Sequence, residues 1–376
     1  MNAKLHRVLI AYETEAAARA RLVAHGYEEK IAAEIAVYLA QATDLPAFMP
    51  EILQALAAEG IGAEFVALDD LVQALHRPGF VAAESLLWCM TDGIRFYRGS
   101  AVPALARLLG VPRYGAPPLA QHLCQDKFLS ATAAHAAGLP CPPALLLEGF
   151  RTVGELGAWP AEGPYFVKPN TLGAKIGIFA DSRCETLEEA RGRAERLWHR
   201  YRDRAVVQPF VAGEDVRVSF METGKDFRAQ LGIFRLLKDA RSETGGAFMT
   251  MRDNATLSGA RDTAGTRGGF GATREAAFVP RMANLRADPD AAATVAAVEA
   301  AAVRLANLLG LADCFSMDLR IDRDGTAWFL EFEVCPAVTI YDFQTYLRDL
   351  YGLSLGAALA KSFGLAHARA GGMGEA

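Results

Sequence analysis

Three acidic side chains near the C-terminal end of the chain stand where a β-hairpin would bring them together. Asp318 precedes the dipeptide Asp324-Gly325, and Glu331 and Glu333 follow it. An Asp-Gly dipeptide between two alternating runs is a strong signal for a hairpin with a two-residue type I′ turn. Counted outward from that turn, Asp318 lies opposite Glu331, and side-chain alternation puts Glu333 on the same face. The spacing therefore predicts three carboxylates on one face of a hairpin.

Such a cluster of like charges needs a partner of opposite sign. Directly opposed residues have Cβ atoms roughly 4.5–5.5 Å apart, and like charges at that separation destabilise the pair. Carboxylate oxygens are hard ligands that suit Mg²⁺ or Mn²⁺, and Mg²⁺ commonly combines one or two protein carboxylates with substrate phosphates. We therefore predict a metal site that serves a nucleotide. The alternative is a solvated strand face whose acids form salt bridges with Arg320 or a neighbouring arginine.

A second group of residues has the composition of a phosphate-binding loop. Lys168 ends the apolar run 165–168, and a loop containing Gly173, Lys175 and Gly177 follows it. Glycines let backbone N–H groups approach an anion closely, and lysines add point charges for phosphate oxygens. Taken alone, the segment is more typical of a simple hairpin turn.

The segment 206–214 predicts a strand that runs into a hinge. Backbone groups at such a hinge could bind an adenine, and Glu214 could accept hydrogen bonds from ribose hydroxyls. The alternative for Glu214 is an ordinary loop carboxylate.

The elements that must position these residues fall into three predicted domains. An alternation of apolar runs (5–12, 64–68 and 86–90) with helical stretches (14–42, 50–59 and 102–109) favours a mostly parallel sheet covered by helices. Prolines cluster from residue 112 to 118 and from 140 to 143, where domain boundaries are common. We therefore predict an α/β (α+β) protein with domains at 1–118, 119–212 and 213–376.

The second and third domains contain the candidate site. Their predicted strands are 165–168, 176–180, 205–210, 215–221 and 228–236, and their predicted helices are 124–137, 186–201 and 290–309. The segment 242–273 is rich in Gly, Arg and Thr and lacks periodicity, so we expect a lid over the site, with disorder as the alternative. The residues after His367 are expected to form a loose tail.

The composition restricts the partners and the compartment. The 376 residues are 52% hydrophobic and carry a formal net charge of -5, so a broad basic surface for nucleic acid is not expected. The six cysteines have no spacing typical of zinc ligands or a disulfide framework, which fits a reducing cytoplasm. Because no leader-like segment or long apolar run occurs, we predict a soluble, cytoplasmic protein without a membrane partner.

In order and spacing, these elements resemble the ATP-grasp superfamily, and in particular the D-alanine–D-alanine ligases and their relatives. The resemblance covers the chain from about residue 86 onward and implies an N-terminal β/α domain followed by central and C-terminal ATP-grasp domains. The matching motifs are Gln125-Asp-Lys127, Lys168-Pro169, Gly173-Ala-Lys-Ile-Gly177, Gln208 with Gly213-Glu214, and Ser316-Met-Asp318 with Glu331-Phe-Glu333-Val-Cys-Pro336-Ala337.

The resemblance also implies a role for each matched residue. ATP would be bound by Lys127, Lys168, the loop residues Gly173, Ala174, Lys175 and Gly177, and the hinge residues Gln208, Val211 and Glu214. Asp318, Glu331 and Glu333 would bind two Mg²⁺ ions, which offset charge as the γ-phosphoryl group moves. The implied reaction phosphorylates a carboxylate to an acyl phosphate, which an amine then attacks to give an amide, ADP and phosphate.

The chain departs from the D-alanine–D-alanine ligase pattern at several positions. A substrate motif after the first strand is replaced by residues 11–15, and the family's arginine two residues before the metal aspartate is Ser316. A loop serine is Lys175, an asparagine metal ligand is Glu333, and a glycine beside the first substrate is Ala337. These changes argue against D-alanyl-D-alanine as the product and leave the ATP-dependent chemistry intact.

Arginines could contribute to catalysis beside the lysines. Arg320 shares a strand face with Ser316 and Asp318, so it could replace the missing arginine, although a surface salt bridge is equally expected. A carboxylate or a γ-phosphate could be bound by an arginine in or beyond the lid, namely Arg252, Arg261, Arg267, Arg274 or Arg281. Our predicted catalytic set is Lys168, Lys175, Arg281 and Arg320.

The leading hypothesis is an ADP-forming ligase that joins a carboxylate, expected to belong to an amino acid, to an amine. One alternative is an ATP-grasp enzyme that phosphorylates its substrate and stops, and a second is a non-catalytic nucleotide-binding module. The expected partners are small-molecule substrates, and a homodimer is compatible with the sequence. The expected cofactors are ATP and Mg²⁺, with Mn²⁺ as a substitute.

Overall fold

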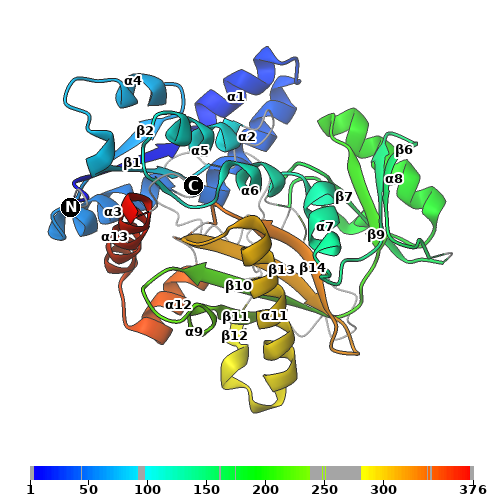
Figure 1. Ribbon diagram of the computed structural model, residues 1–376. Coiled ribbons are helices and arrows are strands. Elements are labelled where there is room, and N and C mark those ends of the chain that lie inside the picture. The colour runs from blue at the N-terminus through cyan, green and yellow to red at the C-terminus, as the bar shows by residue number, and fades with distance from the viewer. Residues whose placement is uncertain are drawn as a thin grey trace, which may run out of the picture.

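The computed structural model describes residues 4–43, 45–91, 98–160, 162–173, 175–237, 248, 250, 281–336, 338 and 341–372. Its described strands form three sheets, which lie in separate regions of Figure 1. The strands of each sheet come from one of the three predicted segments. The α/β class is therefore confirmed, and the boundaries at 118 and 212 remain our proposal.

The first sheet is parallel and has the strand order β2-β1-β3-β4. Its strands are β1 (Arg7–Tyr12), β2 (Gly62–Ala67), β3 (Ser85–Cys89) and β4 (Arg113–Tyr114). The helices of this region are α1 (Glu15–Ala24), α2 (Glu29–Thr43), α3 (Leu45–Ala58), α4 (Leu71–Leu75) and α5 (Arg98–Leu108). The single helix predicted over 14–42 is wrong, because Gly26 with φ of 80° ends the first helix and a second one begins at Glu29.

The second sheet is antiparallel and has the order β6-β5-β9-β7-β8. Its strands are β5 (Ala144–Glu148), β6 (Arg151–Leu156), β7 (Tyr165–Pro169), β8 (Arg183–Cys184) and β9 (Ala205–Pro209). Helices α6 (Pro118–Leu123), α7 (Lys127–Ala136) and α8 (Leu187–Tyr201) accompany it.

Two expectations for this region are corrected. The helix predicted over 124–137 begins only at Lys127, because the Asp126 side chain caps it by accepting a hydrogen bond from Leu129 N at 2.8 Å. The strand predicted over 176–180 is a turn, in which Ile176 N and Ile178 N bond to Gly173 O and Lys175 O at 3.0 Å.

The third sheet is antiparallel and has the order β12-β11-β10-β13-β14. Its strands are β10 (Glu214–Met221), β11 (Gly232–Leu237), β12 (Arg281–Asn284), β13 (Cys314–Ile321) and β14 (Ala327–Glu333). Helix α9 (Phe227–Gln230), capped by Asp226, replaces the start of the strand predicted over 228–236. The long helix α11 (Ala292–Leu309) lies beside this sheet in Figure 1 and shares its apolar core.

Two C-terminal helices, α12 (Tyr341–Tyr351) and α13 (Leu355–Gly372), connect the third region to the first. Figure 1 shows α13 running beside α3. Phe363 of α13 is fully buried, with its ring centroid 4.7 Å from that of Tyr114 and 5.3 Å from that of Trp88. The loose tail predicted after His367 is therefore wrong as far as residue 372, because the helix continues to that point.

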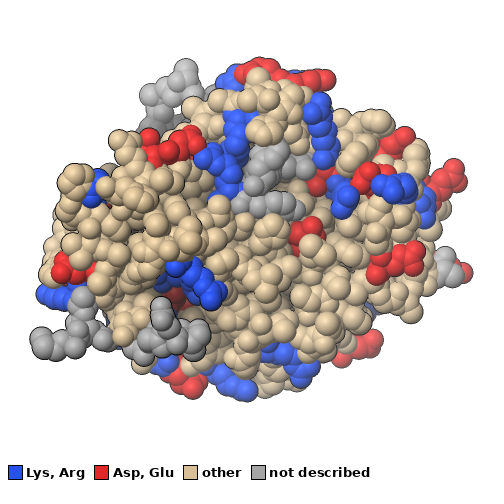
Figure 2. All heavy atoms as spheres, turned by 45° about the horizontal axis from the view of Figure 1, so that its top comes forward, with Lys and Arg blue, Asp and Glu red and all other residues tan. Residues whose placement is uncertain are grey.

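One described helical stretch, Pro289–Leu309, is long and apolar enough to cross a membrane. Its inner face, which includes Val298, Ala302 and Leu305, packs into the core of the third sheet. On the face drawn in Figure 2, acidic and basic side chains are interspersed among residues of other kinds.

Candidate active site

The carboxylate hairpin is formed by β13 and β14. Asp318 is the register partner of Glu331, as predicted, and Ser316 is the partner of Glu333. The predicted two-residue turn is wrong, because the strands are joined by five residues, 322–326. Leu330 forms a bulge, because Leu319 pairs with Phe329 and Asp318 pairs with Glu331. The extra residue restores the predicted pairing for Asp318 and the residues before it.

Local hydrogen bonds explain the wider loop. The Asp322 carboxylate accepts hydrogen bonds from Asp324 N and Thr326 N, both at 2.9 Å, and from Trp328 Nε1 at 2.7 Å. An aspartate that bonds its own backbone two residues on favours an Asx-type turn over the tight type I′ turn. The Asp-Gly rule therefore identified the hairpin without giving its loop length.

Arg217 of β10 contacts the acidic face of the hairpin and was not predicted from the sequence. It is the register partner of Asp318, and its Nη1 donates to the two Asp318 carboxylate oxygens at 3.1 and 3.2 Å. Its Nη2 donates to Ser316 Oγ and to Glu333 Oε2, both at 2.9 Å. A usable signal existed in the sequence, since polar Asp215 and Arg217 alternate with apolar residues along β10.

Two lysines reach the hairpin from the second sheet region. Lys127, the first residue of α7, donates to Leu172 O at 2.8 Å and lies 3.3 Å from Glu331 Oε2. Lys168, near the end of β7, is buried, and this burial lowers the pKa of its ammonium group to about 8, against the opposing effect of Glu331. The predicted phosphate-binding lysines therefore lie beside the predicted metal carboxylates.

Lys175 lies in the turn after Gly173 with a φ of 59°. Desolvation lowers the pKa of its side chain, with Asp318 acting in the opposite direction. Gly177 has a φ of 78°, and a Cβ there would stand 2.6 Å from Pro169 Cγ, so the turn requires glycine at this position. Ala174 lies outside the described residues.

The two facing carboxyl groups differ in their affinity for protons. Burial raises the pKa of Asp318 to about 7, and the nearby Glu333 and Glu331 add to this effect while Arg217 opposes it. Burial also acts to raise the pKa of Glu331, but Lys127 and Lys168 outweigh it and hold this pKa below its ordinary value. The pair therefore combines one carboxyl group that retains a proton up to about pH 7 with one that the neighbouring lysines keep ionised.

A pocket opens between the second and third sheets at this hairpin. The space between its lining atoms is about 890 Å³, a volume that includes open solvent at its mouth. Its lining includes the charged residues Lys168, Lys175, Asp318 and Glu331 and the apolar or aromatic residues Phe166, Phe210, Val211, Leu236, Phe248 and Leu330. Gln208, from β9, also lines the pocket and is buried.

The structure places Glu214 outside this pocket. Its side chain is 57% exposed and pairs with Arg235 at 2.8 Å, whereas the next residue, Asp215, lines the pocket. The position of Glu214 differs from the expectation, because side chains alternate along β10 from Glu214 onward and Asp215 is the one that faces the pocket.

Arg320 also lines the pocket, but it does not occupy a free surface position. Its Nη1 lies 2.6 Å from Asp215 Oδ1, its guanidinium stands 5.0 Å from the Phe210 ring centroid, and the residue is buried. The expected salt bridge is therefore present, but it is buried. The Arg281 side chain, the lid residues 242–247, 249 and 251–273, and Arg274 lie outside the described residues.

The donor set suits Mg²⁺, although the described residues include no group of three Asp, Glu, His or Cys side chains arranged around one ion. Asp318 and Glu331 supply carboxylate oxygens to the pocket, the hard ligands that Mg²⁺ prefers. Glu333 instead accepts from Arg217 and from Ser316 Oγ, at 2.9 and 3.1 Å. A metal ion that is bound together with a nucleotide could be coordinated by Asp318 and Glu331 in their present positions. Glu333 could coordinate it if the metal replaced Arg217 as the partner of its carboxylate.

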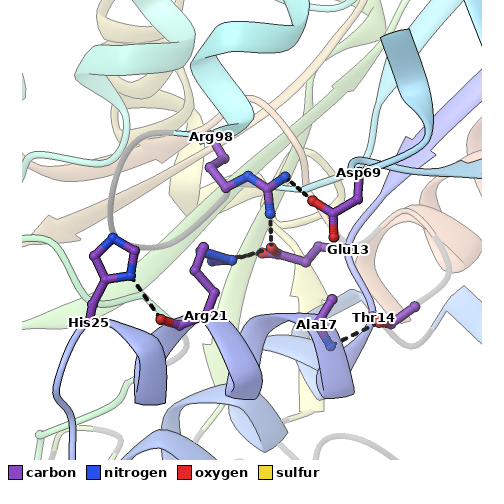
Figure 3. Close-up of polar contacts among 7 residues, drawn as sticks. All are labelled: Glu13, Thr14, Ala17, Arg21, His25, Asp69 and Arg98. Carbon is purple, nitrogen blue, oxygen red and sulfur yellow. Dashed lines mark hydrogen bonds and ion pairs between the residues drawn. The ribbon is translucent and has the colours of Figure 1, made fainter. Parts of the chain in front are cut away.

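A second charged cluster lies at the carboxyl end of β1 (Figure 3). Glu13 accepts from Arg21 Nη2 of α1 at 3.0 Å and from Arg98 Nη1 of α5 at 3.1 Å, and Arg98 also pairs with Asp69. The Glu13 side chain is only 5% exposed, and this burial raises the pKa of its carboxyl group against the effect of both arginines. The strand order places β1 between β2 and β3, so the strand order reverses between β1 and β3, and ligands of open α/β sheets commonly bind at the carboxyl ends of such strands.

The carboxyl ends of β1 and β3 are connected to the hairpin. Cys335, two residues beyond Glu333, donates through Sγ to Cys89 O at the end of β3 over 3.1 Å. Ala11 at the end of β1 is the register partner of Cys89. The Glu13 cluster and the carboxylate hairpin are therefore neighbouring parts of one region of the molecule.

Comparisons with known proteins agree with this architecture. No family model matches the chain. It is 33% identical over 121 residues to a D-alanine–D-alanine ligase of Corynebacterium aurimucosum. The matched segment covers 32% of this chain and 33% of that protein. It is 24% identical over 324 residues to the D-alanine–D-alanine ligase of Nitrosospira multiformis. This match covers 84% of this chain and 90% of that ligase.

A solved structure matches over nearly the whole length. The Bacillus anthracis D-alanine–D-alanine ligase complexed with ATP superimposes with a TM-score of 0.60 at 14% identity, covering 99% of both chains. The chain therefore has the ATP-grasp fold that the sequence motifs predicted.

Proposed function

We propose that this chain, an ATP-grasp protein of the D-alanine–D-alanine ligase-like type, is an ADP-forming ligase that joins a carboxylate to an amine. The observation that carries the proposal is the pairing of Asp318 with Glu331 beside Lys168 in a pocket that apolar residues also line. A nucleotide needs both environments, because its base is a flat aromatic ring whose faces pack against apolar side chains, and its polyphosphate is anionic and metal-bound. The resemblance to ligases supplies the reaction class.

In this proposal the adenine lies among the apolar residues of the pocket. Phe166 and Phe210 offer aromatic faces, Gln208 offers an amide, and the backbone at Val211 offers hydrogen-bonding groups. We assign the ribose contact to Asp215 in place of Glu214, since only the former lines the pocket. Arg320 would then hold Asp215 in position across a 2.6 Å ion pair.

The phosphates lie at the charged residues of the pocket. Lys127, Lys168 and Lys175 would contact them, and the turn at Gly177 would bring backbone N–H groups close. Asp318 and Glu331, with Glu333, would hold Mg²⁺, which supplies charge neutralisation for the transferring phosphoryl group. The side chains of this chain therefore orient the triphosphate and offset its charge.

The reaction has two steps. A substrate carboxylate oxygen forms a bond to the γ-phosphorus while the bond to the bridging oxygen breaks, which releases ADP and leaves an acyl phosphate. An amine nitrogen then bonds to the acyl carbon, the carbon–oxygen bond to phosphate breaks, and the nitrogen loses a proton. The ammonium groups of the lysines around Glu331 lower the energy of the developing negative charge.

We assign the substrate side to the carboxyl ends of β1 and β3. Ligands of open α/β sheets bind outside the carboxyl ends at such a reversal of strand order. Glu13 and Asp69 could accept from an ammonium group, and Arg98 could bind an anionic group there, which suits an amino acid or a dipeptide. Residues 11–15 and Ser316 differ from the D-alanine–D-alanine ligase pattern, so we propose a product other than D-alanyl-D-alanine.

The test is a screen of amino acid pairs for ADP release, with mass spectrometry of the products. We expect one class of pairs to give ADP, phosphate and an amide in equal amounts, dependent on Mg²⁺ or Mn²⁺. ADP formation without an amine requirement would instead indicate a phosphotransferase. All six cysteines are free, which is compatible with the cytoplasmic location that we propose for this reaction.

A further inference from the structure

The guanidinium of Arg217 contacts two of the three carboxylates assigned to the metal. It donates to both Asp318 oxygens and to Glu333 Oε2, and it also donates to Ser316 Oγ, all within 2.9–3.2 Å. Such a fork holds planar carboxylates in a fixed orientation. The ligands are therefore already bound to a cation of the protein itself.

We propose that Arg217 is a positioning residue that holds the metal ligands in place and opposes binding of free divalent cations until the nucleotide arrives. The inference rests on the proposed function, because it concerns the same carboxylates. It goes beyond that function by giving the site an order of loading, in which metal enters with the nucleotide.

The charge balance of the site supports this order. Four cationic side chains, Lys127, Lys168, Lys175 and Arg217, surround the three carboxylates Asp318, Glu331 and Glu333. A free divalent cation would therefore enter a region that already has an excess of positive charge, whereas a polyphosphate reverses that sign. Arg217 is the cation that competes most directly, since it contacts the same oxygens that would bind the metal.

The neighbouring strand explains how the arginine fits. Position 316 on β13 is a buried serine, whose Oγ accepts from Arg217 and donates to Glu333 Oε2 at 3.1 Å. A small hydroxyl there leaves room for a long side chain from β10, and it extends the hydrogen-bond network that the arginine begins. Arg217 and Ser316 therefore act as one unit across the two strands.

The test measures binding of Mn²⁺ alone by titration calorimetry or electron paramagnetic resonance. In Arg217→Met the chain length is nearly kept and the charge is lost, so we expect nucleotide-free Mn²⁺ affinity to rise by on the order of tenfold. We expect ATP turnover of the same variant to fall by on the order of a hundredfold, because the ligands are no longer oriented. A purely structural arginine would give losses in both measurements.

Arg217→Lys serves as a second variant, because lysine keeps the positive charge but lacks the two guanidinium nitrogens that contact Asp318 and Glu333. It should keep nucleotide-free Mn²⁺ affinity near that of the unmodified protein while turnover still falls. Arg235→Met is the matched control, since Arg235 lies on the adjacent strand and pairs with Glu214 and Asp288 instead. Both of its measurements should stay unchanged.

The inference is overturned if Arg217→Met, shown to be folded by circular dichroism, binds Mn²⁺ alone no more tightly than the unmodified protein. It is also overturned if Arg217→Lys gains Mn²⁺ affinity as much as Arg217→Met does. Neither outcome affects the proposed function, which is tested separately by product formation in the unmodified enzyme.

Discussion

Arg217 and Asp318 face each other across β10 and β13, and Arg217 Nη1 lies 3.1 and 3.2 Å from the two Asp318 carboxylate oxygens. The two residues are 101 positions apart in the chain. An antiparallel register thus brings a cation onto the aspartate that we assign to the metal. In the described structure Arg217 therefore fixes the orientation of this carboxylate.

The buried ammonium of Lys168 should make nucleotide binding depend on pH. With a pKa of about 8, Lys168 is protonated below that value and loses its charge above it, before a phosphate is bound. Affinity for ADP should therefore fall as the pH rises above 8, by up to about tenfold per pH unit. Calorimetric titrations between pH 7 and pH 10 measure this dependence.

Lys168→Arg is the comparison for this prediction, because an arginine stays protonated over the whole range. Its ADP affinity should be weaker overall and flat with pH. The same decline in both proteins would assign the pH dependence to another group.

The Glu13 cluster at the end of β1 should affect one substrate and not the nucleotide. Arg98→Ala removes one of the two arginines that pair with Glu13. It also removes the arginine that pairs with Asp69. We expect KM for the acid or amine substrate to rise about tenfold or more, because a charge-assisted hydrogen bond is lost, with KM for ATP unchanged. Steady-state kinetics with each substrate varied in turn give the two values.

Arg77→Ala is the matched control, because Arg77 forms a partly exposed ion pair with Glu64 of β2 in the same sheet. Neither KM should change in that variant. An equal rise of both KM values in Arg98→Ala would point to a general loss of folded enzyme and would remove the substrate assignment.

Helix α13 should contribute to global stability. Phe363 is fully buried and packs edge-on against Tyr114 and Trp88 of the first sheet. Phe363→Ala should lower the free energy of unfolding by about 3–5 kcal/mol, the usual cost of truncating a buried aromatic side chain. Chemical denaturation monitored by circular dichroism measures it, with Phe150→Ala, whose side chain is 53% exposed, as the control.

A loss in Phe363→Ala no larger than that in the control would show that α13 is dispensable. The sequence predicts a loose end after His367, because the last residues of a domain are commonly poorly ordered. The helix is instead stabilised by tertiary packing against β3 and β4, which local composition does not reveal.

Local patterns predicted the elements of the fold and the pairing of Asp318 with Glu331. Strand alternation and the Asp-Gly turn are short-range signals, so the hairpin could be placed without knowing the rest of the structure. The loop length was missed because Asp322 forms its own hydrogen bonds with the backbone of the turn. Register beyond the bulge nevertheless agreed with the prediction.

Long-range pairing explains what the sequence did not reveal. Arg217 reaches the site only because β10 pairs with β13, and no periodicity within one segment indicates which two strands pair. The shift from Glu214 to Asp215 had a local cause, since it depends on where β10 begins. The buried pairing of Arg320 with Asp215 comes from the same register.

The central claim is that Asp318 and Glu331 hold the metal used in ATP turnover, and Asp318→Asn tests it most directly. We expect the variant to keep the Tm of the unmodified protein and its rate of ADP formation to fall by on the order of a thousandfold. The reason is that a bound metal ion stabilises the charge of the transition state by several kcal/mol. Glu331→Gln should behave alike, and Glu214→Gln, an exposed carboxylate on the same sheet, should keep full activity. ADP formation near that of the unmodified protein in folded Asp318→Asn would contradict the account.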